Sequence, residues 1–227
     1  MMDALNNLFR SFPAVKVIDS GIADQKYVHL DLAKNTGFQN FKNASEFESA
    51  IEKYLSENDA DVAFGGYNEV RNLYSRSALF KNQNDEERNI HIAMDLWIKA
   101  ETPVLAALDG KIHSFKNNIG LGNYGPTVIL EHHFEGFTFY TLYGHLSIES
   151  LENLEIDAVF HQGDAIGYLG DATENGDYAP HLHFQMIKNL DGNFGDYPGV
   201  CGKSKLEYYL ENCPDPNLLL KINNTTP

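Results

Sequence analysis

The stretch Pro180-His181-Leu182-His183-Phe184 alternates polar and apolar side chains with a period of two residues. Such alternation is typical of a β-strand with one polar and one apolar face. His181 and His183 must then leave the same face, with Cα atoms about 6.5–7 Å apart, while Leu182 and Phe184 point to the opposite side. Two imidazoles on one face are costly to bury unless something satisfies them. They therefore either bind a metal or line a wet cleft.

Two further segments carry histidines with informative neighbours. His91 and Asp95 stand four residues apart, and on a strand side chains at this spacing face the same way. An imidazole and a carboxylate together make a good zinc pair, but a histidine that only hydrogen-bonds to a nearby aspartate gives the same pattern. His145 follows Gly144 at the end of an expected strand, where a structural histidine is the simpler interpretation when this segment is taken alone. The histidines that match no motif are expected at the surface or in the core: His113, His132, His133 and His161.

The region around these motifs is rich in β-forming residues. From residue 62 onward, short runs of Val, Ile, Phe and Tyr alternate with Gly, Asn and Asp turns at the spacing of about 8–12 residues that favours an all-β sandwich or barrel. Asp109-Gly110 predicts a hairpin between residues 104–108 and 111–115. A second pair of strands is expected at residues 127–132 and 137–143.

The two ends of the chain differ from this β-rich region in their residue patterns. Residues 1–60 predict a small α+β appendage, with strands at 14–18 and 27–32 and a helix at 44–55 that Asn43 or Ser45 can cap. The sequence thus suggests three regions: the appendage, a β-rich domain at 61–200 and a helical extension at 201–227.

The C-terminal extension combines a helix with two cysteines. Ser204 can cap this helix, and Cys213-Pro214 ends it. A chain of this length can build a core without a disulfide, so Cys201 and Cys213 are expected to be free buried thiols.

Composition excludes several classes of protein. The 227 residues include 17 Lys and Arg against 32 Asp and Glu, which gives a formal net charge of -15. Nucleic-acid and anionic-membrane binders need a basic face, so neither partner is expected. No apolar run approaches the roughly 20 residues of a membrane helix, and Asp3, Asn6 and Asn7 interrupt any export signal at the N-terminus. We therefore expect a cytoplasmic location.

Taken together, the motifs are more specific than any one of them. Their order is His-x-x-x-Asp from His91, Tyr-Gly-His-Leu-Ser around His145 and His-Leu-His-Phe from His181. This order resembles the lysostaphin and LytM type of zinc metallopeptidase over residues 62–187. The resemblance implies a curved antiparallel β-sheet core of the duplicated hybrid, lipoyl-like type. The expected fold is therefore mainly β, with an α+β N-terminal appendage and a short C-terminal helix.

The resemblance also implies roles for individual residues. His91, Asp95 and His183 would hold one zinc ion per chain, and three protein ligands leave a fourth position for water, as in catalytic zinc sites. His145 and His181 would not bind metal. They would take the proton from that water and stabilise the tetrahedral intermediate.

Other polar residues are candidates for contact with a substrate. They are Tyr67, Arg71, Asn123 and Tyr124, of which Arg71 matches an arginine usual in that family and the last two lie in a glycine-rich loop. A surface or structural role is the alternative for each of them.

The implied activity is that of a zinc metalloendopeptidase acting on peptidoglycan-like or glycine-containing peptides through a zinc-bound water. Its relatives are exported, which makes an extracytoplasmic location the alternative to the expected cytoplasmic one. Two other functions stay open: a cytosolic zinc hydrolase of a small amide or peptide, and a zinc-stabilised binding or regulatory domain without turnover. The N-terminal appendage is a candidate to close over the cleft.

Overall fold

The computed structural model describes residues 4–35, 38, 41–71 and 86–223. The helices are α1 (Ala4–Ser11), α2 (Ala44–Glu57), α3 (Leu206–Asn212) and α4 (Asn217–Leu220), with short 3-10 helices at Ile148–Leu151 and Lys203–Lys205. The strands are β1 (Tyr27–His29), β2 (Val62–Gly65), β3 (Glu69–Val70), β4 (Ile90–His91), β5 (Met94–Trp97), β6 (Pro103–Leu105), β7 (Gly110–Asn118), β8 (Gly125–Phe134), β9 (Phe137–Gly144), β10 (Val159–Phe160), β11 (Ala165–Tyr168), β12 (His181–Ile187) and β13 (Val200–Cys201).

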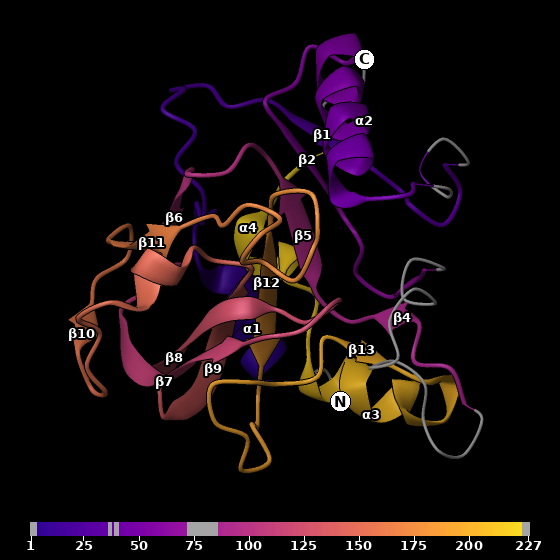
Figure 1. Ribbon diagram of the computed structural model, residues 1–227. Coiled ribbons are helices and arrows are strands. Elements are labelled where there is room, and N and C mark those ends of the chain that lie inside the picture. Colours follow the sequence, from indigo (N-terminus) through magenta and orange to yellow (C-terminus); the bar gives the residue numbers. More distant parts are fainter. Residues whose placement is uncertain (1–3, 36–37, 39–40, 72–85, 224–227) are drawn as a thin grey trace.

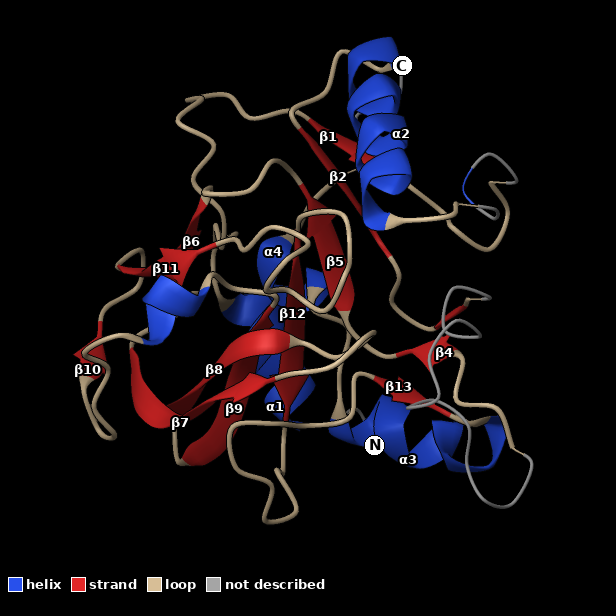
Figure 2. Ribbon diagram, viewed as in Figure 1, coloured by secondary structure: helices blue, strands red, loops and turns tan. Residues whose placement is uncertain are grey.

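The largest sheet has eight strands in the order β1-β2-β5-β12-β9-β8-β7-β10 (Figure 1). All neighbouring strands in it are antiparallel except β1 and β2, which pair in parallel. Two smaller sheets have the orders β13-β4-β3 and β11-β6. Figure 2 shows that strands dominate the fold and that helices are few. The mainly β, antiparallel fold with a short C-terminal helix is therefore confirmed.

Strand β12 lies in the middle of this sheet, between β5 and β9, and is buried on both faces. Leu182, Phe184 and Met186 point into the main hydrophobic core. His181 and His183 line a cavity on the other face. The alternation expected from the sequence is confirmed, and its cause is the two-residue period of the strand.

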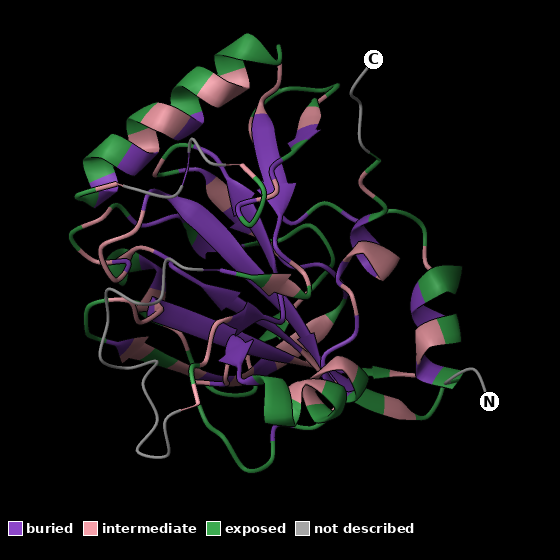
Figure 3. Ribbon diagram, turned by 90° about the vertical axis from the view of Figure 1, so that its right-hand side faces the viewer, coloured by how far each residue is buried: buried purple, intermediate pink, exposed green. Residues whose placement is uncertain are grey.

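Helix α2 covers one end of the sheet. Asn43 caps the helix, as expected, because its side-chain oxygen accepts a hydrogen bond of 2.9 Å from the amide of Glu46. Phe47 and Ile51 of this helix pack in a second hydrophobic cluster that also contains Leu32 and Trp97. Figure 3 shows the outer face of the helix exposed and the central strands buried. The N-terminal region therefore forms a layer over β5.

The N-terminal region shares structure with the β-rich region. β1 extends the main sheet through β2, and the ring of Phe9 in α1 packs edge to face on Phe139 in β9, with ring centroids 4.8 Å apart. Removing residues 1–60 would strip both contacts from the sheet and its core. The division at residues 60 and 200 stays a prediction.

Two predictions about strands differ from the structure. Residues 14–18 form no strand, and only Ile18 makes an isolated bridge, to Val104. The hairpin across Asp109-Gly110 is wrong, because β6 pairs with β11 and β7 pairs with β8 and β10. Apolar alternation indicates a strand but does not select its partner. Here β6 pairs with β11, which lies about 60 residues further along the chain. The expected hairpin of β8 and β9 is confirmed.

At the C-terminus, α3 ends at Cys213 as expected, but Ser204 does not cap it. The amide and hydroxyl of Ser204 donate instead to the carboxylate of Glu86.

Cys201 and Cys213 are free and buried. Burial raises the pKa of Cys213 to about 12 and that of Cys201 to about 11, so both thiols stay protonated at neutral pH. Among the described residues, no helix has the length and apolar character to cross a bilayer.

His132 lies in the core, away from the motifs. Nδ1 donates to the carbonyl of Asp109 over 2.8 Å, and Nε2 lies 2.7 Å from the hydroxyl of Thr141. Burial lowers the pKa of this imidazole from 6.5 to about 4. The imidazole is therefore neutral in the folded protein at pH values where it would be protonated in the unfolded chain.

This shift predicts a stability loss in acid. A histidine whose pKa is lowered on folding stabilises the fold above about pH 6.5, and the contribution is lost as the pH falls from about 6.5 to about 4. One proton across this window corresponds to about 3 kcal/mol of unfolding free energy. We expect urea unfolding at several pH values to show a shallower acid slope for His132→Gln than for the wild type. Equal slopes would show that His132 is not the group that titrates.

Candidate active site

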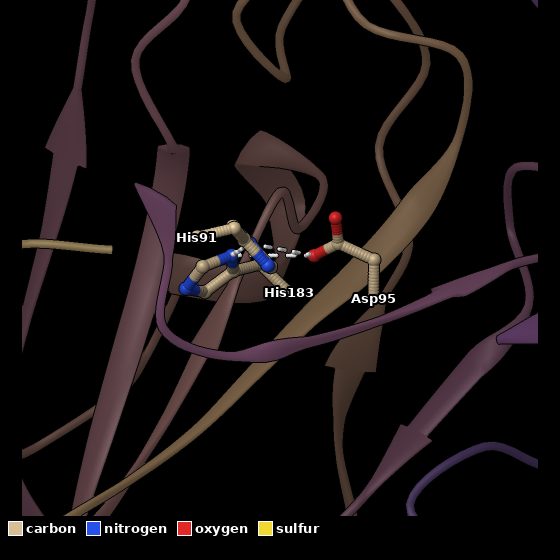
Figure 4. A group of neighbouring side chains, drawn as sticks. All are labelled: His91, Asp95 and His183. Atoms are coloured by element: carbon tan, nitrogen blue, oxygen red, sulfur yellow. Dashed lines mark hydrogen bonds and ion pairs between the residues drawn. The ribbon is translucent and has the colours of Figure 1, made fainter. Parts of the chain in front are cut away.

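Three of the motif residues meet at one point in the structure. His91 ends β4, Asp95 lies on β5 and His183 lies opposite Asp95 on β12. Oδ1 of Asp95 is 3.4 Å from Nε2 of His91 and 3.3 Å from Nδ1 of His183. The two ring nitrogens are 3.1 Å apart. Figure 4 shows all three side chains pointing toward one another. Each of the three residues is at most 3 % exposed.

The outer atoms of the two imidazoles are held by protein acceptors. Nδ1 of His91 donates to the carbonyl of Gly66 over 2.9 Å. Nε2 of His183 faces the side-chain oxygen of Gln185 at 3.2 Å and the hydroxyl of Tyr124 at 3.3 Å. A neutral imidazole carries one proton, so these bonds direct a lone pair of each ring to the inside. This arrangement is usual for histidines that bind metals.

The inner atoms therefore form a set of three acceptors without a donor. Oδ1 of Asp95 is buried and has no hydrogen-bond partner. Burial, followed by the nearby guanidinium of Arg71, lowers the pKa of His91 to about 4, so this ring is uncharged at neutral pH and its single proton is the one on Nδ1. A buried carboxylate oxygen facing two lone pairs is unfavourable unless a cation lies among them. Two histidines and one aspartate are a donor set that zinc accepts. The residues present thus fit a metal ion.

Asp95 stays ionised because the groups around it lower its pKa by more than burial raises it. Burial alone would raise its pKa, but His91 and Arg71 hold the pKa of this carboxyl well below the ordinary value. Nη1 of Arg71 donates to Oδ2 of Asp95 over 2.5 Å. Arg71 is itself only 4 % exposed. Its guanidinium therefore holds the carboxylate, although its side chain also lies along the cavity wall.

His145 and His181 form a second pair beside the first group. Their ring centroids are 4.2 Å apart, and Nε2 of His181 is 3.9 Å from Oδ1 of Asp95. Nδ1 of His145 donates to the carbonyl of Asn175, and Nδ1 of His181 donates to that of Ala179, each over 2.7 Å. Burial lowers the pKa of both rings, and that of His145 lies well below its usual value. Both rings are neutral at pH 7, with Nε2 free to accept a proton.

A cavity of about 300 Å³ borders the histidines and Asp95. Asn123 and Tyr124 lie in its wall, as the sequence suggested. Tyr67 is not among the lining residues, and its hydroxyl donates to the carbonyl of Cys213 over 2.8 Å. The remaining wall contains residues that no motif indicated: Leu32, Phe47, Arg88, Trp97, Tyr178, and the segment that includes Asn193, Asp196, Tyr197, Pro198, Gly199 and Val200.

The apolar members of this wall carry no local signature of a site. Leu32, Phe47 and Trp97 are typical core residues by sequence, and they do belong to a hydrophobic cluster. They reach the cavity because the turn after β1, helix α2 and strand β5 meet there. Only the tertiary structure brings the N-terminal region to this wall.

Gly66 supports the site through its carbonyl and its lack of a side chain. Its φ is +102°, and an added Cβ would lie 2.0 Å from Nη2 of Arg71 and 2.8 Å from Nδ1 of His91. We expect Gly66→Ala to displace both side chains and to weaken metal binding by about 10–100-fold, the usual cost of losing an outer partner. Gly163→Ala is the matched control, because Gly163 has φ +88° but open space around it. Equal metal affinity in the two variants, measured by chelator competition, would contradict this prediction.

A buried aspartate with two histidines, flanked by two further neutral histidines in a cavity, is an arrangement typical of metal-dependent hydrolases. Residues 89–193, a little under half of the chain, match the model of peptidase family M23. This match confirms the resemblance that the motifs indicated.

Solved structures give a weaker likeness. The chain is similar to a putative M23 peptidase from Pseudomonas aeruginosa, at 17% identity and a TM-score of 0.37, over 56% of this chain and 42% of that one. It is similar to the catalytic domain of the antimicrobial peptidase lysostaphin from Staphylococcus simulans, at 25% identity and a TM-score of 0.36, over 53% and 80% of the two chains. The catalytic domain of the prophage-encoded protein EnpA from Enterococcus faecalis gives 17% identity and a TM-score of 0.38, over 52% and 84%. No curated protein matches the chain significantly in sequence.

Proposed function

We propose that this protein is a zinc-dependent peptidase that hydrolyses amide bonds in peptidoglycan-like or glycine-containing peptides. One observation carries the proposal: three buried acceptor atoms, on His91, Asp95 and His183, converge with no donor among them. The peptidase family match supplies the reaction class.

The metal would be held by Nε2 of His91, Oδ1 of Asp95 and Nδ1 of His183. A zinc ion in such a site acts as a Lewis acid that polarises a carbonyl and lowers the pKa of a water toward about 7. Arg71 keeps Oδ2 of Asp95 occupied, so that Oδ1 is the oxygen directed at the ion. The carbonyl of Gly66 and the side-chain oxygen of Gln185 likewise hold the outer ring nitrogens of His91 and His183, so that the inner nitrogens face the proposed metal position.

His145 and His181 move the proton. Each ring is anchored at Nδ1 by a backbone carbonyl, so Nε2 is the atom that exchanges protons. One of these Nε2 atoms accepts a proton from the attacking water as the carbon–oxygen bond forms. The same proton passes to the leaving amine as the carbon–nitrogen bond breaks. While it carries this proton, the ring is a cation and stabilises the negative oxygen of the tetrahedral intermediate, and the other ring packs against it with the two centroids 4.2 Å apart. The lowered pKa of both rings leaves them unprotonated and ready to accept at neutral pH.

The proposal is tested on the purified chain of 227 residues. Metal is removed with a chelator, one equivalent of zinc is restored, and bound metal is measured by mass spectrometry. The zinc-loaded and metal-free forms are then incubated with isolated cell walls, glycine peptides and small amides, with products identified by mass. We expect one zinc per chain and zinc-dependent cleavage of the peptide substrates.

The other outcomes separate the alternatives. Cleavage of small amides without cleavage of walls or peptides would favour a hydrolase of small metabolites. Tight zinc binding without any turnover would favour a zinc-stabilised binding domain. A chain that binds no zinc would overturn the proposal.

A further inference from the structure

Glu69 is the one acidic side chain of strand β3, and its carboxylate is occupied on both oxygens. The side chain is 9 % exposed. Oε2 accepts a hydrogen bond of 2.5 Å from Nε of Arg71. Oε1 accepts one of 2.7 Å from the amide of Leu32 and a longer one, of 3.4 Å, from the amide of Ala33.

The strand geometry explains why Glu69 is close to the metal-ligand candidates. In the sheet β13-β4-β3, Glu69 lies directly opposite His91. Glu69 and Arg71 are two residues apart in an extended segment, where side chains at this spacing share a face. The amide of Arg71 bonds to the carbonyl of Asn89, which prolongs this pairing by one step. Both charged side chains are thus delivered to the side on which Asp95 lies.

The contacts form a continuous chain across the molecule. It starts at the backbone of Leu32, passes through the carboxylate of Glu69 and the guanidinium of Arg71, and ends at Oδ2 of Asp95. The guanidinium carbon also lies 5.6 Å from the centre of the Trp97 ring. Leu32 and Trp97 are lining residues of the cavity. The carboxylate of Glu69 therefore contacts both Leu32 in the cavity wall and Arg71, the residue that holds the proposed metal ligand Asp95.

We propose that Glu69 is a positioning residue of the active site, which orients Asp95 through Arg71 and anchors the Leu32 wall of the cavity. The inference rests on the proposed metal site at His91, Asp95 and His183. An arginine side chain has many rotamers, and fixing it at Nε leaves Nη1 a defined approach to Asp95. Without Glu69, the guanidinium can rotate and pair with either carboxylate oxygen. Asp95 then loses its preference for presenting Oδ1 to the metal.

The test compares two variants of Glu69 with a control, each made in the chain of 227 residues. Glu69→Ala removes both contacts, whereas Glu69→Gln keeps a neutral acceptor for the Leu32 amide and loses the negative charge that faces the guanidinium of Arg71. Asp164→Ala is the control, because its carboxylate also accepts a backbone hydrogen bond, from His161, in a turn outside the cavity lining. Circular dichroism and thermal melting establish that each variant is folded.

The readouts are zinc affinity, the visible spectrum of the cobalt form and hydrogen exchange at the Leu32 amide. We expect Glu69→Ala to lower zinc affinity by about 10–100-fold, as loss of an outer partner does, to alter the cobalt spectrum and to speed exchange at Leu32. Glu69→Gln should keep the slow exchange of the Leu32 amide but should not keep the wild-type zinc affinity. Asp164→Ala should match the wild type in all three.

The outcomes distinguish this inference from the proposed function. If the wild type binds zinc and a folded Glu69→Ala or Glu69→Gln protein binds it equally well with an unchanged cobalt spectrum, Glu69 has no positioning role. If the wild type binds no zinc at all, the metal site is wrong and the inference falls with it. Should the alanine variant fail to fold, the glutamine variant alone decides.

Discussion

His183→Ala is expected to abolish tight zinc binding and peptide cleavage together. The variant removes one of the three proposed ligand atoms and leaves only His91 and Asp95 to hold the ion. The loss in affinity should exceed the roughly 10–100-fold that an outer partner costs. Asp95→Asn should act in the same direction, because the amide has no charge to hold a cation. It also leaves the buried guanidinium of Arg71 without the carboxylate it contacts at 2.5 Å.

His161→Ala is the matched control for this experiment, since His161 is an exposed histidine that lies 3.7 Å from Asp109 and outside the cavity lining. It should retain wild-type zinc affinity and activity. Bound zinc after extensive dialysis, together with the rate of peptide cleavage, provides the measurement. Full zinc occupancy in His183→Ala would show that the ion is held elsewhere.

His181→Ala and His145→Ala should separate catalysis from metal binding. Neither ring is among the three converging acceptors, so zinc affinity should stay within a few-fold of the wild type. The cleavage rate should fall by about 10²–10⁴-fold, the usual contribution of a general acid–base. The rate constants are measured with a peptide that the wild type cleaves, and zinc affinity is measured on the same preparations.

Chemical rescue sharpens this second prediction. Free imidazole should restore part of the activity to the alanine variants, because the deleted ring leaves space beside a ring that is still in place. The pair His145 and His181 is in close contact, at 4.2 Å between centroids, so the double variant should cost less than the product of the two single effects. A pair of single variants with wild-type rates would remove both histidines from the mechanism.

Much of the fold could be predicted because it follows from local pattern. The alternation around His181 and His183 identified β12, and the spacing of Phe47 and Ile51 with Asn43 before them identified α2. Strand partners were harder to predict. The apolar run at residues 103–105 looks the same whether it pairs with its neighbour or with β11, and long-range packing chooses between them.

The site divides in the same way. Five histidine and aspartate positions were recognisable from residue type and spacing, and the structure brings all five to one cavity. The role of Arg71 beside Asp95 and the wall built by Leu32 and Phe47 were not recognisable. Each depends on where a separate segment of the chain lies, and an apolar residue that lines a cavity has the same local pattern as one in the core.

The sequence by itself determined a β-rich peptidase domain and the residue types at its centre. It did so because strand periodicity and the spacing of histidines and aspartate are local properties. Only the tertiary structure decided that Oδ1 of Asp95 is the unpartnered oxygen, and that Glu69 and Arg71 connect it to the N-terminal region. The physical reason is that hydrogen bonds and burial at a site depend on distances between segments far apart in the chain.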